Sequence, residues 1–187
     1  MPAFPKLSFS HLGIFVFDLE RMKRFYTQML GFVASDHGIV YDSQKIAFLS
    51  RDPREHHQLV LVEGRTAGPD DALLNQISMR VDSLADLRRV YALTLRHAEV
   101  SDVHPINHVV SFSVYFRDPE GNRIEIFCDS PWYVDQPHIE PLDFDLSDDQ
   151  ILADTESRYR SDPTFQPIDD WRREFMDRME EADRERD

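Results

Sequence analysis

The chain has 187 residues, which is room for one compact domain or two small modules and too few for a large multidomain enzyme. No apolar run approaches the ~20 residues that span a bilayer, and the first ten residues lack the order of a signal peptide. The sequence therefore predicts a cytoplasmic protein without a membrane partner. The single cysteine, Cys128, can form neither an internal disulfide nor a cysteine metal cluster, so any metal must bind to His, Glu, Asp or Gln.

Charge divides the chain into two regions. Residues 1–130 hold 17 acidic and 14 basic side chains, a net charge of −3, and residues 131–187 hold the other 18 and 7, a net charge of −11. We therefore expect a folded body over residues 1–130 and an acidic extension over residues 131–187. No basic stripe is present of the kind that binds a phosphate backbone, which argues against nucleic acid as a partner.

The first half of the body follows the order βαβββ. Alternating apolar residues predict a strand over residues 11–17, and apolar residues at three- and four-residue spacing predict a helix over 18–30 that Gly31 ends. Three short strands are expected near 33–35, 44–50 and 57–62. Residues 8–63 thus form one predicted module.

The second half repeats that order. A strand is expected over residues 75–81, and Ser83 with Asp86 resembles the N-cap of an amphipathic helix that runs to about Leu95. Further strands are expected near 99–103, 109–116 and 123–128, with the turn Asp118-Pro119-Glu120-Gly121-Asn122 between the last two. The shared order predicts an α+β fold made by internal duplication, with a second module over residues 73–128.

Three segments carry a resemblance to a known family: Ser10 to Ile14, His56 to Leu61, and above all Tyr115-Phe116-Arg117-Asp118-Pro119-Glu120-Gly121-Asn122-Arg123-Ile124-Glu125. Together with the duplicated unit, they resemble the vicinal oxygen chelate superfamily of glyoxalase I, bleomycin-resistance proteins and type I extradiol dioxygenases. The resemblance covers about residues 8–130 and is nearest to small one-domain extradiol dioxygenase-like members. It implies two tandem βαβββ modules that form a half-open barrel around a metal site.

The resemblance also implies four metal-ligand positions. They fall on His11, His57, Gln76 and Glu125. Alternation supports the last one, because Glu125 shares a strand face with Arg123 and Phe127 while the neighbouring isoleucines face the other way. Two imidazoles and one carboxylate favour Fe(II), with Mn(II) or another divalent metal as a further option.

Gln76 departs from the extradiol pattern, which has a histidine at that position. A glutamine oxygen is a weaker donor than a neutral imidazole. Two arrangements follow. Either His57 joins the metal in compensation, or the ligands are His11, Gln76 and Glu125 with His57 beside them as an acid–base residue; of these we favour a site where all four side chains converge.

The resemblance assigns catalytic roles to Tyr115 and His108. Tyr115 lies ten residues before Glu125, where extradiol enzymes carry a tyrosine that hydrogen-bonds a substrate oxygen, and a phenol there can stabilise charge on the ring. His108 matches the acid–base histidine that precedes this strand, with His104 as the alternative.

The leading hypothesis is an Fe(II)-dependent extradiol-type dioxygenase that uses O₂ to cleave a catechol-like aromatic diol. Gln76 favours an alternative, a glyoxalase-like metal-dependent isomerase or lyase that uses no O₂. A third candidate is a non-catalytic protein of the same fold that binds a small molecule.

The extension is expected to contain an extended stretch at 131–137 and two helices. Ser147 opens the first, which runs to about Arg158, and the second covers residues 168–184. Trp171, Phe175 and Met179 form an apolar stripe on this second helix. The stripe needs cover, either from the protein's own body or from a second subunit in a homodimer.

Overall fold

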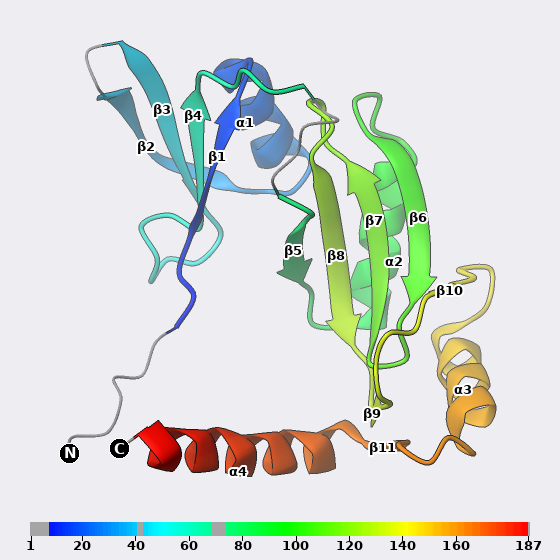
Figure 1. Ribbon diagram of the computed structural model, residues 1–187. Helices are drawn as coiled ribbons and strands as arrows, with labels where there is room; N and C mark the ends of the chain where they lie inside the picture. The colour runs from blue at the N-terminus through cyan, green and yellow to red at the C-terminus, as the bar shows by residue number, and fades with distance from the viewer. Residues whose placement is uncertain (1–7, 41–42, 69–73, 187) are drawn as a thin grey trace.

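The computed structural model describes residues 8–40, 43–68 and 74–186. It confirms the α+β class, and the described parts contain four helices and mixed sheets (Figure 1). Residues 1–7 of the predicted body, and residue 73 at the start of the second predicted module, lie outside the described residues.

The first half of the body consists of β1 (Leu12–Val16), α1 (Leu19–Gln28), β2 (Val33–Val40), β3 (Gln44–Ser50) and β4 (Leu59–Glu63). The second half consists of β5 (Ile77–Arg80), α2 (Leu84–Thr94), β6 (Ser101–Asn107), β7 (Ser111–Arg117) and β8 (Arg123–Asp129).

Two sheets form the body. One has the strand order β1-β4-β3-β2, and the other has the order β10-β6-β7-β8-β5, in which β10 (Glu140–Pro141) comes from the extension. The first and last strands of each half pair in parallel, β1 with β4 and β5 with β8. In Figure 1 the strands β1 and β5 are the facing edges of the two sheets, and in the described residues each pairs only within its own sheet. The sheets do not close into a barrel.

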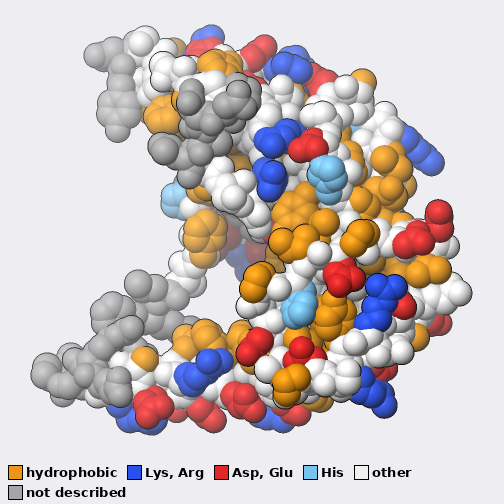
Figure 2. Space-filling view, turned by 45° about the vertical axis from the view of Figure 1, so that its right-hand side comes forward, with side chains coloured by type: hydrophobic (Ala, Val, Ile, Leu, Met, Phe, Trp, Pro, Cys, Tyr) orange, Lys and Arg blue, Asp and Glu red, His pale blue; other side chains and the backbone are white. Residues whose placement is uncertain are grey.

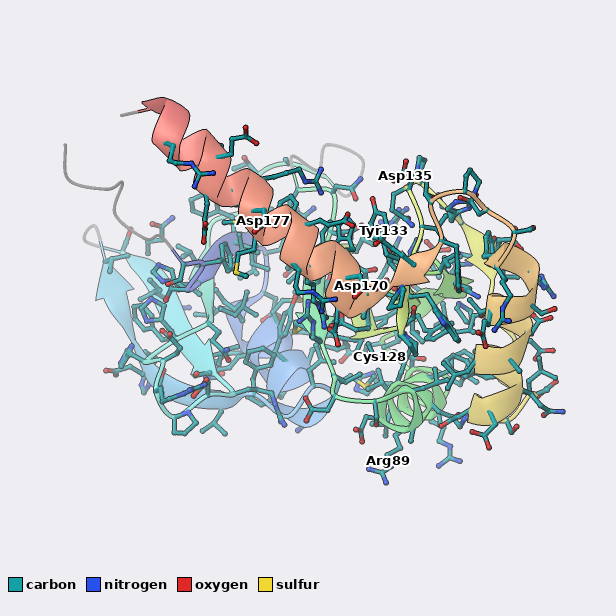
Figure 3. The ribbon with its side chains drawn as sticks, turned by 90° about the horizontal axis from the view of Figure 1, so that it is seen from below. Arg89, Cys128, Tyr133, Asp135, Asp170 and Asp177 are labelled. Atoms are coloured by element: carbon teal, nitrogen blue, oxygen red, sulfur yellow. The ribbon has the colours of Figure 1, made fainter. Side chains whose placement is uncertain are left out.

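The helix α1 covers the back of the first sheet, and α2 covers the back of the second. The other face of both sheets is open toward the viewer in Figure 1. The helix α1 begins where the Asp18 side chain accepts a hydrogen bond from the Arg21 amide, and Ser83 caps α2 as the sequence predicted. The apolar sides of both helices and the covered sheet faces make one core. Cys128 is part of it, lies on the side of its sheet toward α2 (Figure 3), and has a pKa raised to about 11 by burial. This cysteine therefore serves packing.

Strands β7 and β8 alternate between the core and the open face. Phe112, Val114 and Phe116 are buried in the core, as are Ile124 and Ile126 of the next strand. The residues between them, which include the polar candidates of the sequence analysis, therefore lie on the face away from α2.

The turn from Asp118 to Asn122 connects the two halves of the body. The buried Asp118 carboxylate accepts hydrogen bonds from the amides of Glu120 and Asn122, which shape the turn, and from the hydroxyl of Tyr26 in α1. Burial raises the pKa of the Asp118 carboxyl group. Burial of the Tyr26 phenol, together with the nearby Asp118 charge, raises the pKa of Tyr26.

Glu120 of the same turn acts on the chain just before α1. Its carboxylate accepts hydrogen bonds from the amides of Phe17 and Asp18 at 2.8–2.9 Å, and it lies 3.7 Å from the guanidinium of Arg65. The Arg65 and Glu120 side chains are only 8% and 4% exposed. The turn predicted between β7 and β8 is therefore also a buried link to the first half.

The extension wraps the lower end of the second sheet. It includes β9 (Trp132–Tyr133), which pairs with β11 (Gln166–Pro167), then α3 (Asp148–Tyr159) and α4 (Ile168–Arg186). Its two-residue strands β9, β10 and β11 were not predicted. None of the helices in the described ranges has a stretch long and apolar enough to cross a membrane.

The helix α4 is anchored near its start and free beyond. Trp171 stacks on Tyr133 with ring centroids 4.8 Å apart, and Phe175 stacks on Trp171 at 5.0 Å. Beyond this anchor Phe175, Met176 and Met179 are 42%, 55% and 55% exposed. Figure 1 shows α4 crossing below the body, and Figure 2 shows a hollow between this helix and the body. In the predicted stripe, Trp171 is thus covered by Tyr133 of the extension itself, while Phe175 and Met179 stay largely exposed.

Candidate active site

Glu125 lies at the centre of the open face of the second sheet. Its strand β8 runs between β5 and β7, so Ser78 and Tyr115 are its neighbours across the two strand pairs. The residue is 7% exposed. A carboxylate so buried needs hydrogen-bond donors, and the strand register supplies them.

Four donors converge on this carboxylate. Its Oε1 atom accepts from the hydroxyls of Tyr115 at 2.6 Å and Ser113 at 2.8 Å. Its Oε2 atom accepts from the Ser78 hydroxyl at 2.5 Å and the Gln76 amide nitrogen at 2.8 Å. A carboxylate has about four acceptor positions, so this set uses its capacity. Two of the four sequence candidates, Gln76 and Glu125, are therefore in direct contact.

His108 joins the same network through Tyr115. Its Nε2 atom lies 3.0 Å from the Tyr115 hydroxyl and 4.0 Å from Glu125 Oε1, while its Nδ1 donates to the carbonyl oxygen of His138 at 2.6 Å. His104, the alternative, instead pairs with Asp102 at 2.6 Å and is largely exposed. His104 is the cross-strand neighbour of Tyr115, but the ring that contacts the Tyr115 hydroxyl is that of His108.

The position of His108 depends on a strained turn. Val109 has a φ of 69°, which is unfavourable for a β-branched residue, and it is fully buried. The Asn107 side chain accepts from the Val109 amide, and the Ser130 hydroxyl donates to the Val109 carbonyl. These contacts hold the turn in a conformation that costs about 1–3 kcal/mol.

Counting protons shows what this network can do. His108 donates from Nδ1, so Nε2 is an acceptor when the ring is neutral. The single phenolic proton of Tyr115 then faces two acceptors, His108 Nε2 and Glu125 Oε1. Burial and the Glu125 charge raise the pKa of Tyr115, which keeps that proton on the phenol. The three groups can therefore accept one further proton and pass it along the row.

The other two candidates, His11 and His57, lie on the first half of the body. Their ring centroids are 4.3 Å apart, and His57 also contacts the rings of His56 and Phe48. His57 precedes β4 rather than lying in it. Burial and the neighbouring His11 and His56 lower the pKa of His57, which favours the neutral, metal-binding form.

The four candidate ligands are thus arranged as two pairs, His11 with His57 and Gln76 with Glu125. Two imidazoles, a carboxylate and an amide suit Fe(II) or Mn(II), so the donors fit a divalent metal in kind. In the described ranges, however, no three His, Cys, Asp or Glu side chains converge closely enough to hold an ion. The set expected from sequence is present as residues and is not assembled around one point.

Sequence reasoning missed two members of the network. Ser78 and the His138 carbonyl were not singled out, although both contact the candidate residues directly. Ser78 could have been found, because it lies two residues after Gln76 and alternation places both on one face. The His138 carbonyl could not, since it depends on the path of the extension.

The fold and this face define a class of protein. Residues 8–126 match the model of the glyoxalase/bleomycin resistance protein/dioxygenase superfamily. The chain belongs to this superfamily, which confirms the resemblance seen in the sequence.

Particular relatives are also similar in sequence. The chain is 31% identical over 134 residues to biphenyl-2,3-diol 1,2-dioxygenase 2 of Rhodococcus globerulus, a match that covers 70% of this chain and 66% of the relative. It is 26% identical over 142 residues to a metapyrocatechase of Pseudomonas sp. (strain CF600), covering 74% of this chain and 45% of the relative. The chain therefore spans less than two thirds of the length of these relatives.

Solved structures share the fold. A glyoxylase/bleomycin resistance protein/dioxygenase domain from Frankia sp. EAN1pec superposes with a TM-score of 0.57 at 21% identity, covering 67% of this chain and 99% of that one. A fosfomycin resistance protein from Mesorhizobium loti superposes with a TM-score of 0.50 at 20% identity, covering 64% and 89%. At these identities the likeness concerns the fold alone.

Proposed function

We propose that this protein is a metal-dependent extradiol-type dioxygenase that opens a catechol-like ring with O₂. The observation that carries the proposal is the row His108–Tyr115–Glu125, in which a phenol lies between an imidazole at 3.0 Å and a buried carboxylate at 2.6 Å. Similarity to a biphenyl-2,3-diol dioxygenase and a metapyrocatechase supports the same reaction class. In that reaction the ring bond beside one hydroxylated carbon breaks, and both oxygen atoms of O₂ enter the product.

The metal is proposed to be held by Glu125 and His11, with His57 and Gln76 as the further candidates. A bound Fe(II) would hold the diol oxygens and O₂ side by side and pass electron density between them. The two pairs of ligands must approach each other to share one ion, and the Gln76 amide must turn its oxygen rather than its nitrogen toward the site.

The chain's own residues handle the protons. His108 Nε2 has an open acceptor position, so Tyr115 can turn its hydroxyl from Glu125 to His108 and pass its proton to that ring as the phenol oxygen takes a proton from a diol hydroxyl. The Tyr115 phenol can donate to a substrate oxygen that gains charge as the ring loses aromaticity. The apolar side chains Ile106 and Ile139 beside this row can pack against a ring.

The test measures O₂ consumption. Protein loaded without air with Fe(II), Mn(II) or Zn(II) is mixed with catechol, and O₂ and catechol are followed together. We expect equimolar loss of both with Fe(II) or Mn(II) and none with Zn(II), which has no redox chemistry.

Variants of the row connect that activity to the site. Tyr115→Phe and His108→Ala should each lower turnover by roughly 10²- to 10⁴-fold and leave the bound metal in place. Tyr91→Phe in α2, where the ring stacks on Phe144 outside the site, is the matched control. Full activity in both site variants, or no O₂ uptake with any metal, contradicts the proposal.

One observation favours a second candidate. Gln76 contacts Glu125, and an amide at this position is what a glyoxalase-like isomerase or lyase of the superfamily would carry. Such an enzyme would convert its substrate with the metal and without O₂. This alternative predicts that the protein converts an added hemithioacetal to its α-hydroxy thioester under nitrogen. It also predicts that the protein consumes no O₂ when catechol is added.

A further inference from the structure

A small pocket lies beside Tyr115 on the open face of the second sheet. Its volume is about 190 Å³, and its lining includes His104, Ile106, His108, Tyr115, Arg123 and Ile139. Pockets for drug-sized ligands start at roughly 300 Å³, so this one suits a single ring or a ring substituent. Ile139 is 72% exposed, and a ligand in the pocket would cover it.

Arg123 is the unbalanced charge of this pocket. Among the described residues its guanidinium has neither an ion-pair nor a hydrogen-bond partner, although the protein as a whole has a net charge of −14. The pocket's carboxylate, Asp102, is already engaged by Arg117 at 3.0 Å and His104 at 2.6 Å. The charged group of this pocket that no described residue engages is therefore Arg123.

The register sets the exposed Arg123 beside a second arginine. Arg123 lies directly across from Arg117 in the pairing of β7 with β8, and like charges facing each other destabilise a sheet. Arg117 is compensated by Asp102 and by the Gly121 carbonyl, whereas Arg123 is not. An anion bound in the pocket would complete the pattern.

Geometry relates Arg123 to the reacting end of the site. Arg123 and Glu125 are two residues apart on β8 and lie on one face, which separates their Cα atoms by about 6.7 Å along the strand. That distance is comparable to the span from a diol oxygen across a benzene ring to a carboxylate on the far side. Tyr115, the cross-strand partner of Glu125, lines the pocket at the diol end.

We infer that the substrate is a single-ring catechol that carries a carboxylate, and that Arg123 binds this carboxylate while the diol lies at Tyr115 and Glu125. The inference rests on the proposed function and narrows its substrate class. Arginine suits this role because its planar guanidinium can donate two parallel hydrogen bonds to a carboxylate.

The experiment compares two catechols of nearly the same shape, 3,4-dihydroxybenzoate and its neutral amide, 3,4-dihydroxybenzamide. In the Fe(II)-loaded protein the kcat/KM ratio of acid to amide should be roughly 10 to 100, the range expected for a charge-assisted hydrogen bond. Arg123→Gln should bring the ratio to about 1, and Arg123→Glu should reverse it. The matched control is Arg96→Gln, because Arg96 is exposed just after α2 and outside the pocket.

Binding of 3,4-dihydroxybenzoate without air, measured by titration calorimetry, separates this inference from the proposed function. Tight binding that Arg123→Gln weakens 10-fold or more supports the inference even if no O₂ is consumed, in which case only the proposed reaction fails. Turnover of both catechols with a ratio that Arg123→Gln leaves unchanged overturns the inference and preserves the reaction. Failure of the unaltered protein to bind 3,4-dihydroxybenzoate also overturns it.

Discussion

At the scale of single residues, Glu125 combines a charge with four hydrogen bonds, and a substitution tests both. In Glu125→Gln an NH₂ group replaces one of the two carboxylate oxygens. The two donors that this oxygen accepts from in the unaltered protein would then face another donor. We expect bound divalent metal to fall to background and the free energy of unfolding to drop by about 1–3 kcal/mol. Metal analysis and urea unfolding measure the two effects.

A matched control for that variant is Glu63→Gln, since Glu63 is a glutamate of β4 whose pairing with Lys45 is at the surface. It should change neither the metal content nor the stability by more than about 1 kcal/mol. Undiminished metal in a folded Glu125→Gln protein would exclude Glu125 as a ligand.

Gln76 permits a test in the opposite direction. Gln76→His exchanges a weak amide donor for an imidazole and gives up one 2.8 Å hydrogen bond to Glu125. If Gln76 is a weak or spectator ligand, the affinity for Fe(II) should stay the same or rise, measured by equilibrium dialysis without air. A loss of metal would mean that the amide has a geometric role that an imidazole cannot take.

Alternation along the strands was enough to predict that Glu125 and Tyr115 lie on an open polar face. It could not choose between His104 and His108, because the choice depends on the strained turn at Val109 and on a carbonyl of the extension. It also could not reveal that Arg123 lacks a partner, since that follows from which strand lies opposite and from the contacts of Asp102.

At the scale of elements, the turn from Asp118 to Asn122 joins the two halves of the body, and Glu120 is its central contact. In Glu120→Gln one carboxylate oxygen becomes an NH₂ group that faces the Phe17 amide and the Arg65 guanidinium. Because this leaves a buried arginine without its counter-charge, the free energy of unfolding should fall by about 3–5 kcal/mol. Urea unfolding followed by tryptophan fluorescence measures it.

Glu99→Gln is the control for this element, because the Arg21–Glu99 pair near the same turn is 38–41% exposed. An exposed pair contributes at most about 1 kcal/mol. If Glu120→Gln destabilises no more than Glu99→Gln, the turn does not link the halves energetically.

Local patterns predicted the longer elements well and the short ones poorly. The strand at 44–50 and the helix that Ser83 caps were placed correctly, because each has a clear period or cap. The strand near 33–35 extends to Val40 in the structure, where polar residues are held only by pairing with β3. The two-residue strands β9, β10 and β11 carry no period that a sequence could show.

At the scale of the whole molecule, α4 leaves an apolar stripe that the body does not cover. Phe175, Met176 and Met179 remain exposed beyond the stack of Trp171 on Tyr133. Leaving such side chains in water forgoes ~1.5–3 kcal/mol each, so we predict that a second copy of the chain covers them.

Deleting residues 163–187 tests this prediction. The full chain should elute as a dimer and the truncated chain as a monomer, with multi-angle light scattering as the measurement. Phe175→Ser with Met179→Ser is the companion variant, because it keeps the helix and the Trp171 anchor. A full chain that is already monomeric at high concentration contradicts the prediction.

The contact of Glu120 with the start of α1 also affects the order in which parts of the chain can fold. The amides of Phe17 and Asp18 find their acceptor 103 and 102 residues later in the sequence. During synthesis from the N-terminus, they have no protein acceptor until residue 120 has left the ribosome. Contacts over such separations slow folding, because a long loop must close before they form. The sheet of the first half can pair by itself, whereas the junction of β1 with α1 is completed only when the turn of the second half arrives, and we expect this junction to form late in folding.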